Sequence, residues 1–276
     1  MADRKPYPTD VSDEQWARIE PLLPAAKTGG RHRKIDLREV INTLFYQDKT
    51  GCQWAMLPHD LLPKSTVWDY FKAWKTDGTW QKIVDALRRE VRTNAGRESD
   101  PSVACIDTQT VATHHQGAES SKDGFKLIKG RKRHIVVDSL GLLLAVAVTA
   151  GAAHDGRSAP AVLSKLDAQT KRRLEVIFAD AKYQGEFLAN WIIENGDCYH
   201  LVIGKKSEKK GFQPEHVRWV VERTYAWLGY SRRLSKDYER TTTSSEAWVQ
   251  VSSIRLMLRR VTNQKHKHGF TYRSNA

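Results

Sequence analysis

Two short apolar runs, each followed at once by an aspartate, constrain the fold of this chain more than any other feature of its sequence. Residues 103–106 end at Asp107, and residues 174–179 end at Asp180. Short apolar runs of this kind are typical of strands buried inside a sheet. In α/β sheets, sites gather at the carboxyl ends of neighbouring strands. We therefore expect both carboxylates at one edge of a sheet.

A third acidic residue, Glu222, lies in a segment whose pattern predicts a helix. Apolar side chains recur at spacings of three and four through residues 217–228, which gives one buried stripe. Arg218 precedes Glu222 by four residues, so both lie on the same helix face. On this stretch alone, an ordinary surface ion pair remains an open interpretation. The two aspartates that precede the helix favour Glu222 as a member of a carboxylate cluster.

A cluster of three carboxylates requires neutralisation by a cation. Like charges at that separation repel one another by several kcal/mol at an intermediate dielectric constant. Carboxylate oxygens are the hard ligands that suit Mg²⁺ or Mn²⁺. Two such ions about 3.5–4 Å apart stabilise both the attacking and the leaving oxygen in phosphoryl transfer. We therefore expect two divalent ions and a phosphodiester substrate.

The charge balance indicates a polyanionic partner. Lys and Arg number 45 against 32 acidic residues, for a net charge of +13. Nucleic acid is the first expectation and an acidic membrane surface the second. No run of about 18 apolar residues could span a bilayer, and the N-terminus has no secretory signal pattern. The three cysteines form no CxxC pair, so we expect a cytoplasmic protein without a zinc cluster.

Residues 1–95 are predicted to form a helical, helix-turn-helix-like DNA-binding domain. Helices joined by tight turns fit such a module, although the pattern fits a plain helical bundle equally well. A basic turn that favours DNA carries Arg31, Arg33 and Lys34. The candidate recognition helix spans residues 65–74. The polar stretch 93–102 is interpreted as a linker.

Residues 103–262 are predicted to form the second domain, followed by a basic tail at 263–276. The expected element order is β-β-β-α-β-α-β-α-α. A basic run at 129–133 is expected to lead into a strand at 134–138, and one helix is expected over 156–169. Asp138 is a competing acid near the sheet, which we assign to the turn that follows it.

Four segments, in one order along the chain, resemble DDE transposases of the insertion-sequence-five family within the insertion-sequence-four superfamily. They are residues 106–110, residues 130–134 with 138–141, residues 179–185 and residues 218–228. Residues 16–80 resemble the helical domain of the same family. The resemblance therefore covers nearly the whole chain.

The resemblance implies an α/β fold: a ribonuclease-H-like mixed sheet flanked by helices, preceded by an all-helical N-terminal domain. It also implies that Asp107, Asp180 and Glu222 form the metal-binding and catalytic triad. Tyr183 matches the Asp-x-x-Tyr turn of the family, and Arg218 matches the arginine four residues before the glutamate.

The chain departs from the family pattern on both sides of Glu222. Glu215 stands where the family has a tyrosine, and Gly229 stands where it has a lysine. Basic residues just beyond Gly229 are expected to take over phosphate binding. The full set of expected DNA contacts is Arg218, Tyr183, Arg223, Arg131, Lys132, Arg133, Arg232, Arg233, Lys236, Arg31, Arg33 and Lys34.

The implied function is a DNA transposase that acts in the prokaryotic nucleoid. It would cut the ends of an insertion sequence, free 3′-hydroxyls and join them to target DNA. Its partners would be double-stranded DNA, as terminal inverted repeats and target, and a second copy of the chain on that DNA. One alternative is a repurposed DNA-binding protein without catalysis, which the intact triad disfavours. The other is a ribonuclease-H-like nuclease, which the helix-turn-helix-like domain disfavours.

Overall fold

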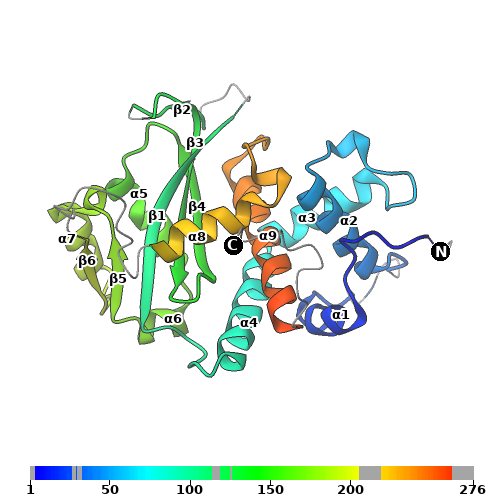
Figure 1. The fold of residues 1–276 in the computed structure, drawn as a ribbon, viewed down its shortest axis with the longest axis horizontal. Helices are drawn as coiled ribbons and strands as arrows, with labels where there is room; N and C mark the ends of the chain where they lie inside the picture. The colour runs from blue at the N-terminus through cyan, green and yellow to red at the C-terminus, as the bar shows by residue number, and fades with distance from the viewer. Residues whose placement is uncertain are drawn as a thin grey trace, which may run out of the picture.

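A mixed sheet of six strands lies between two layers of helices (Figure 1). The computed structural model describes residues 4–26, 29, 33–113, 119–124, 126–204 and 219–262. In Figure 1, α5 and α7 lie on one side of the sheet, and α4, α8 and α9 lie on the other. Among the described residues, none of the helices has the length and apolar character needed to cross a membrane.

The sheet combines antiparallel and parallel pairing, which confirms the expected mixed α/β architecture. Its order is β2-β3-β1-β5-β6, and β4 also pairs with β3. The strand β3 is antiparallel to both of its neighbours, β1 and β4. In contrast, β5 runs parallel to β1, and β6 runs parallel to β5. The strand bounds are β1 Val103–Ala112, β2 Ser121–Lys122, β3 Lys129–Asp138, β4 Leu143–Ala150, β5 Val176–Ala179 and β6 His200–Ile203.

The turn between β3 and β4 is built on Asp138. Its carboxylate accepts hydrogen bonds from the backbone N–H groups of Leu140 at 2.9 Å and Leu142 at 2.8 Å. Gly141 supplies the left-handed conformation with φ +77°. Arg92 pairs with the second oxygen of the fully buried carboxylate at 2.5 Å. These contacts confirm that Asp138 serves the turn.

The N-terminal segment is helical, as expected. Ser12 forms a capping box with Gln15 at the start of α1, and Asp36 caps α2. The helix α3 begins at Lys64, one residue before the start expected at 65. The bounds are α1 Asp13–Ile19, η1 Glu20–Leu22, α2 Leu37–Thr50, η2 Trp54–Met56, α3 Lys64–Thr76 and α4 Thr79–Asn94.

One hydrophobic cluster joins these helices to the sheet. Phe71 and Trp80 from the N-terminal helices, Ile135 from β3 and Trp248 from α9 (Thr242–Val261) all belong to it. The helix α9 packs against both α4 and β4. The same layer contains α8 (Trp219–Gly229) and η4 (Arg232–Leu234). Because the two parts share this core, the expected boundary between a domain at 1–95 and a domain at 103–262 stays a prediction.

The opposite face of the sheet has its own cluster, built with α5 (Asp155–Leu163), η3 (Ala181–Tyr183) and α7 (Glu186–Glu194), and the short helix α6 (Ala168–Arg173) follows α5 in the chain. The expectation of one helix over 156–169 was wrong. The chain breaks after Leu163, and Asp167 caps a second helix by accepting from the N–H groups of Gln169 and Thr170.

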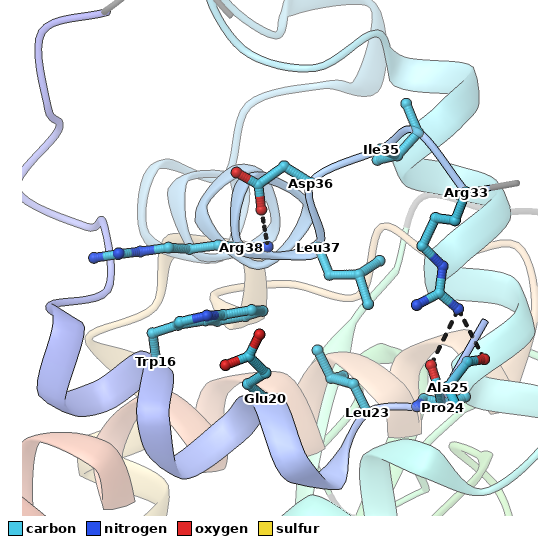
Figure 2. Close-up of a pocket in the computed structure, with 10 residues that line it drawn as sticks. All are labelled: Trp16, Glu20, Leu23, Pro24, Ala25, Arg33, Ile35, Asp36, Leu37 and Arg38. Carbon is cyan, nitrogen blue, oxygen red and sulfur yellow. Dashed lines mark hydrogen bonds between the residues drawn. The ribbon is translucent and has the colours of Figure 1, made fainter.

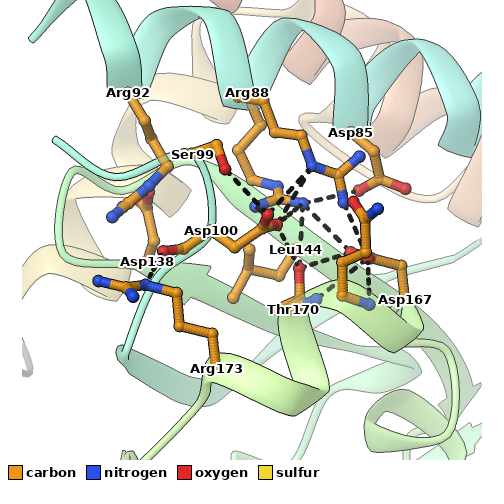
Figure 3. Close-up of polar contacts among 12 residues, drawn as sticks. Asp85, Arg88, Arg92, Ser99, Asp100, Asp138, Leu144, Asp167, Thr170 and Arg173 are labelled. Atoms are coloured by element: carbon orange, nitrogen blue, oxygen red, sulfur yellow. Dashed lines mark hydrogen bonds and ion pairs between the residues drawn. The ribbon is translucent and has the colours of Figure 1, made fainter.

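A buried ion network ties α4 to the linker and to α6 (Figure 3). The Arg88 side chain is fully enclosed and pairs with Asp85 at 3.4 Å, Asp100 at 3.3 Å and Asp167 at 3.2 Å. Arg89 contacts Asp100 and Asp167 as well, at 3.2 and 2.8 Å. The network holds the N-terminal helices against the α6 side of the sheet.

Candidate active site

Asp107 lies in the middle of β1. The expectation that the strand ends at this residue was wrong, because β1 continues to Ala112. The residues after Asp107, of which the first three are polar, are paired with β3, from Thr108 opposite His134 to Ala112 opposite Gly130. This pairing extends the strand beyond the point where apolar character stops. The backbone of Asp107 is therefore held by paired residues that precede it and follow it in β1.

Asp180 follows β5 directly and begins η3. Its side chain accepts a hydrogen bond from the N–H of Lys182 at 2.9 Å. The parallel pairing of β1 with β5 places Val103 opposite Val176, 73 residues apart. Asp107 and Asp180 are also 73 residues apart. The two aspartates therefore lie at equal distances, two residues, beyond Cys105 and Phe178, the last backbone pair of these adjacent strands.

Both aspartates belong to the sheet face that α8 covers. Side chains alternate along a strand, so Asp107 shares a face with Cys105. Asp180 has an extended backbone, with φ −80° and ψ 173°, and continues the alternation from Phe178. Cys105 and Phe178 pack in the same cluster as Val221 of α8. The two carboxylates therefore point to the α8 side.

Glu222 lies on α8, one helical turn before the residue that anchors this helix to β1. The anchor is Tyr225, whose hydroxyl lies 2.9 Å from the carbonyl oxygen of Asp107 and 2.7 Å from that of Arg133. Val221 and Leu228 are buried on the same helix, whereas Glu222 is exposed. The buried stripe expected for this helix is present, and Glu222 stands outside it.

Donor chemistry at this edge fits a divalent cation. Asp107 and Asp180 carry hard carboxylate oxygens that suit such an ion, and Glu222 carries the same chemistry on α8. Within the described parts of the chain, no three His, Cys, Asp or Glu side chains stand close enough together to hold a metal ion. The triad of Asp107, Asp180 and Glu222 therefore stays a prediction.

Tyr183 is placed differently from the expected DNA contact. Its side chain is 1% exposed and packs in the cluster beneath α5 and α7. Its hydroxyl lies 2.7 Å from the Thr108 hydroxyl. Burial raises the pKa of Tyr183 well above its usual value, so the hydroxyl keeps its proton. The expectation that Tyr183 contacts DNA at the surface was therefore wrong, because its side chain lies in the interior.

Three basic residues of β3 are also enclosed, which corrects their expected contact with DNA. Arg131 is 2% exposed and pairs with Asp237 at 3.2 Å. Lys132 pairs with Asp155 at 2.8 Å. Arg133 donates to a carbonyl of η4 at 2.7 Å. Because these groups already have internal acceptors, they leave the set of candidate DNA contacts.

Arg223 is held in a stack of aromatic rings. Its guanidinium lies 4.4 Å from the ring centroid of Trp219 and 4.5 Å from that of Trp227. Arg260 lies over the other side of Trp227 at 4.3 Å. Arg223 also donates to the carbonyl of Leu140 at 3.3 Å. These contacts fix α8 against the β3–β4 turn, which is a structural use of this cation.

Arg233 is likewise internal. Its side chain pairs with Glu239, and its guanidinium lies 5.1 Å from the ring centroid of Trp248. Its exposed neighbours Arg232 and Lys236 remain candidates for phosphate contact. Arg218, which was expected beside Glu222, lies outside the described residues.

The basic turn of the N-terminal helices borders a cavity of about 560 Å³. Figure 2 shows Trp16 and Arg33 on opposite sides of it. Arg33 donates to the carbonyls of Pro24 and Ala25, both at 3.0 Å. Arg33 and Lys34 are exposed, and Arg31 lies outside the described residues.

The role of Tyr225 as an anchor has no signal in the sequence. Its helical spacing predicts burial, but its acceptors are the backbone of residues 118 and 92 positions away. Thr108 and His134 likewise contact each other across 26 residues, and no ligand spacing in the sequence singles either of them out.

Comparison with known proteins identifies two matching families. The family model described as "Transposase DDE domain" matches residues 98–257. The model described as "Putative transposase of IS4/5 family (DUF4096)" matches residues 11–84. Together they cover the sheet with its helices and most of the N-terminal helical segment.

Curated relatives point the same way. The chain is 31% identical over 44% of its length to "Putative transposase for insertion sequence element IS402" from Burkholderia cepacia, and the match spans 60% of that protein. It is 29% identical over 37% of its length to "Insertion element IS402 uncharacterized 16.2 kDa protein" from the same organism, over 71% of that protein. It is 26% identical over 41% of its length to "Uncharacterized protein y4sN" from Sinorhizobium fredii (strain NBRC 101917 / NGR234), over 86% of that protein.

The strand order, the helical N-terminus and the family matches agree with one another. They confirm an α/β fold with a ribonuclease-H-like core. Domains of this family generally use divalent metal ions. The chain therefore belongs to the DDE transposases of the IS4/IS5 type.

Proposed function

We propose that this chain is a DNA transposase that cuts the ends of an insertion sequence and joins the freed 3′-hydroxyls to target DNA. The observation that supports the proposal most is that Asp107 and Asp180 follow the last paired residues of two adjacent parallel strands, each by two positions, in a chain of the DDE family. Cleavage and joining are both in-line displacements at phosphorus, so one set of carboxylates serves both steps.

Asp107, Asp180 and Glu222 would hold the metal, as Mg²⁺ or Mn²⁺ and with two ions. When bound, the metal lowers the pKa of water and neutralises charge on the reacting phosphate. The chain positions its ligands from three directions. Asp107 is fixed by pairing with β3, Asp180 by the N–H of Lys182, and Glu222 by the helix that Tyr225 anchors.

DNA would be held by the exposed basic residues around this edge and on the N-terminal helices. Arg33, Lys34, Arg232 and Lys236 are the described members of that group. Arg31 and Arg218 complete it as proposals. The net charge of +13 supports phosphate contacts along a duplex. Because two element ends must be held together, we propose that the chain acts as a homodimer on DNA.

The proposal is tested by incubating purified protein with Mg²⁺ or Mn²⁺ and a labelled duplex that carries the inverted repeats of the element. We expect cleavage at the repeat ends and joined products with a target plasmid. Glu222→Gln should lose both activities, while Glu194→Gln, an exposed glutamate of α7, should retain them.

An RNA–DNA hybrid included in parallel separates the alternatives. Degradation of the hybrid without joined DNA would identify a ribonuclease-H-like nuclease. Specific binding of the repeats without any cleavage would identify a repurposed DNA-binding protein. Unaltered cleavage by Glu222→Gln would remove Glu222 from the catalytic set.

A further inference from the structure

The backbone pairing between β1 and β5 ends before it reaches the two aspartates. The last paired residues are Cys105 and Phe178, two positions short of each carboxylate. Asp107 continues in β1 and pairs with Ile135 of β3, whereas Asp180 leaves β5 and begins η3. Backbone hydrogen bonds of the β1–β5 ladder therefore do not set the separation of Asp107 from Asp180.

A side-chain contact bridges the two strands at this point. The hydroxyls of Thr108 and Tyr183 lie 2.7 Å apart, across 75 residues of sequence. Thr108 directly follows Asp107. Tyr183 belongs to the turn that Asp180 begins, in which the Tyr183 N–H donates to the Asp180 carbonyl at 3.1 Å. Thr108 is thus linked to Asp107 by the peptide bond, and Tyr183 is linked to Asp180 by the backbone hydrogen bond of the turn.

The contact continues across the sheet through His134. Thr108 Oγ1 lies 3.0 Å from His134 Nδ1, and His134 Nε2 lies 2.8 Å from the hydroxyl of Thr149 on β4. Thr108 and His134 are also register partners in the β1–β3 ladder. Four side chains therefore form one line of hydrogen bonds from β4 to η3.

The available protons determine which group donates and which accepts in each hydrogen bond of this line. His134 is completely buried, and burial lowers its pKa to about 4, so the ring is neutral near pH 7. If Tyr183 donates to Thr108, the Thr108 hydroxyl donates to Nδ1 of His134, and Nε2–H of His134 donates to Thr149. Thr149 then donates to the carbonyl of Ala150, 3.4 Å away. Every hydroxyl proton has one acceptor.

We propose that Thr108 and Tyr183 are positioning residues whose hydrogen bond, oriented by His134, sets the separation of the Asp107 and Asp180 carboxylates. The line lies on the sheet face opposite the carboxylates, because Thr108 alternates with Asp107. It therefore acts through the backbone of its neighbours and not on substrate. The inference rests on the proposed role of the two aspartates as metal ligands.

The test is the affinity of the full chain for Mn²⁺, measured by calorimetric titration without DNA. Tyr183→Phe keeps the buried ring and removes only the hydroxyl. We expect its Kd for Mn²⁺ to rise about tenfold, as is typical when a partner that orients a ligand is lost. Tyr199→Phe is the matched control, because Tyr199 is also buried but bonds Asp197 outside this line. It should bind like wild type.

Substitutions at Thr108 keep the test decisive if Tyr183→Phe fails to fold. Thr108→Val preserves shape and should weaken Mn²⁺ binding, whereas Thr108→Ser retains the hydroxyl and should restore it. The double variant Tyr183→Phe/Thr108→Val should lose no more affinity than Thr108→Val alone, because Thr108→Val already removes the bond to Tyr183 together with the bond to His134. Wild-type affinity in Thr108→Val would overturn the proposal.

One further variant separates this inference from the proposed function. Asp107→Asn should abolish Mn²⁺ binding if the aspartate is a ligand. Binding lost in Asp107→Asn but unchanged in Thr108→Val would reject the positioning role alone. Unchanged binding in Asp107→Asn would reject the metal site itself.

Discussion

Asp107 and Asp180 each lie two residues beyond Cys105 and Phe178, the last backbone pair of β1 and β5, so the same 73 residues separate them as separate the paired Val103 and Val176. This relationship requires β1 and β5 to be parallel neighbours in the sheet. Both aspartates therefore depend on the sheet for their positions. Only Glu222 depends on a separate element, the helix α8.

The anchoring of α8 can be tested with Tyr225→Phe. The carbonyl oxygens of Asp107 and Arg133 would lose their shared donor, so we expect a loss of about 1–2 kcal/mol in the free energy of unfolding. Strand cleavage should fall further, because Glu222 lies one turn away. Urea denaturation and the cleavage assay measure the two effects. Tyr230→Phe, at an exposed residue, is the control. Equal stability of all three proteins would argue against the anchor.

The network around Arg88 should dominate the stability of the α4 contact. Arg88→Met removes the cation from three buried or half-buried aspartates, which leaves their charges without the main partner. We expect a loss of about 3–5 kcal/mol. Arg18→Met breaks a more exposed pair with Glu90 and should cost no more than about 1 kcal/mol. Similar unfolding midpoints for the two variants would contradict the central role of Arg88.

His134 should make stability depend on pH. Burial lowers its folded-state pKa to about 4, below the usual 6.5 of the unfolded chain. Between these values the unfolded chain binds more protons, so stability rises with pH and is lost as pH falls from 6.5 towards 4. The contribution amounts to about 3 kcal/mol.

The measurement is the free energy of unfolding from pH 4.5 to 7.5 for wild type and His134→Gln. The difference between the two proteins should change with pH in the predicted direction, and the variant should have the flatter profile. Parallel profiles would mean that His134 is not neutral and buried in the folded protein.

The exposed basic residues that contact phosphate should be identifiable from the salt dependence of DNA binding. Arg232→Ala is expected to weaken DNA binding and to reduce the slope of log K against log salt by about 0.9, the effect of one phosphate contact. Arg172→Ala removes an exposed cation from α6 and should leave the slope unchanged. Fluorescence anisotropy at several salt concentrations provides the comparison. Identical slopes for Arg232→Ala and wild type would exclude this contact.

Much of the site was predictable because it depends on local pattern. The apolar run before Asp180, the buried stripe of α8 and the turn at Asp138 are all encoded by neighbouring residues, and the structure has all three. The prediction that both aspartates follow neighbouring strands came from the apolar run before each of them, and β1 and β5 are indeed adjacent. The resemblance to DDE transposases then led to the prediction that Asp107, Asp180 and Glu222 are metal ligands.

The rest depends on contacts between distant residues. A basic run at 129–133 resembles a DNA-binding surface, yet Arg131 meets Asp237 across 106 residues and Lys132 meets Asp155 across 23. No local pattern specifies these partners. The position of Tyr183 beneath the sheet likewise depends on Thr108, and the break after Leu163 depends on the cap that Asp167 supplies.

The central claim is that Asp107 and Asp180 act together in metal-dependent strand cleavage. The most direct measurement is the cleavage rate at the element end, in Mg²⁺ and in Mn²⁺, for Asp107→Asn, Asp180→Asn and the control Glu194→Gln. We predict that each aspartate variant binds the duplex normally and cleaves at least about 10²-fold more slowly, while the control cleaves like wild type. Cleavage by either aspartate variant at the wild-type rate would contradict the account.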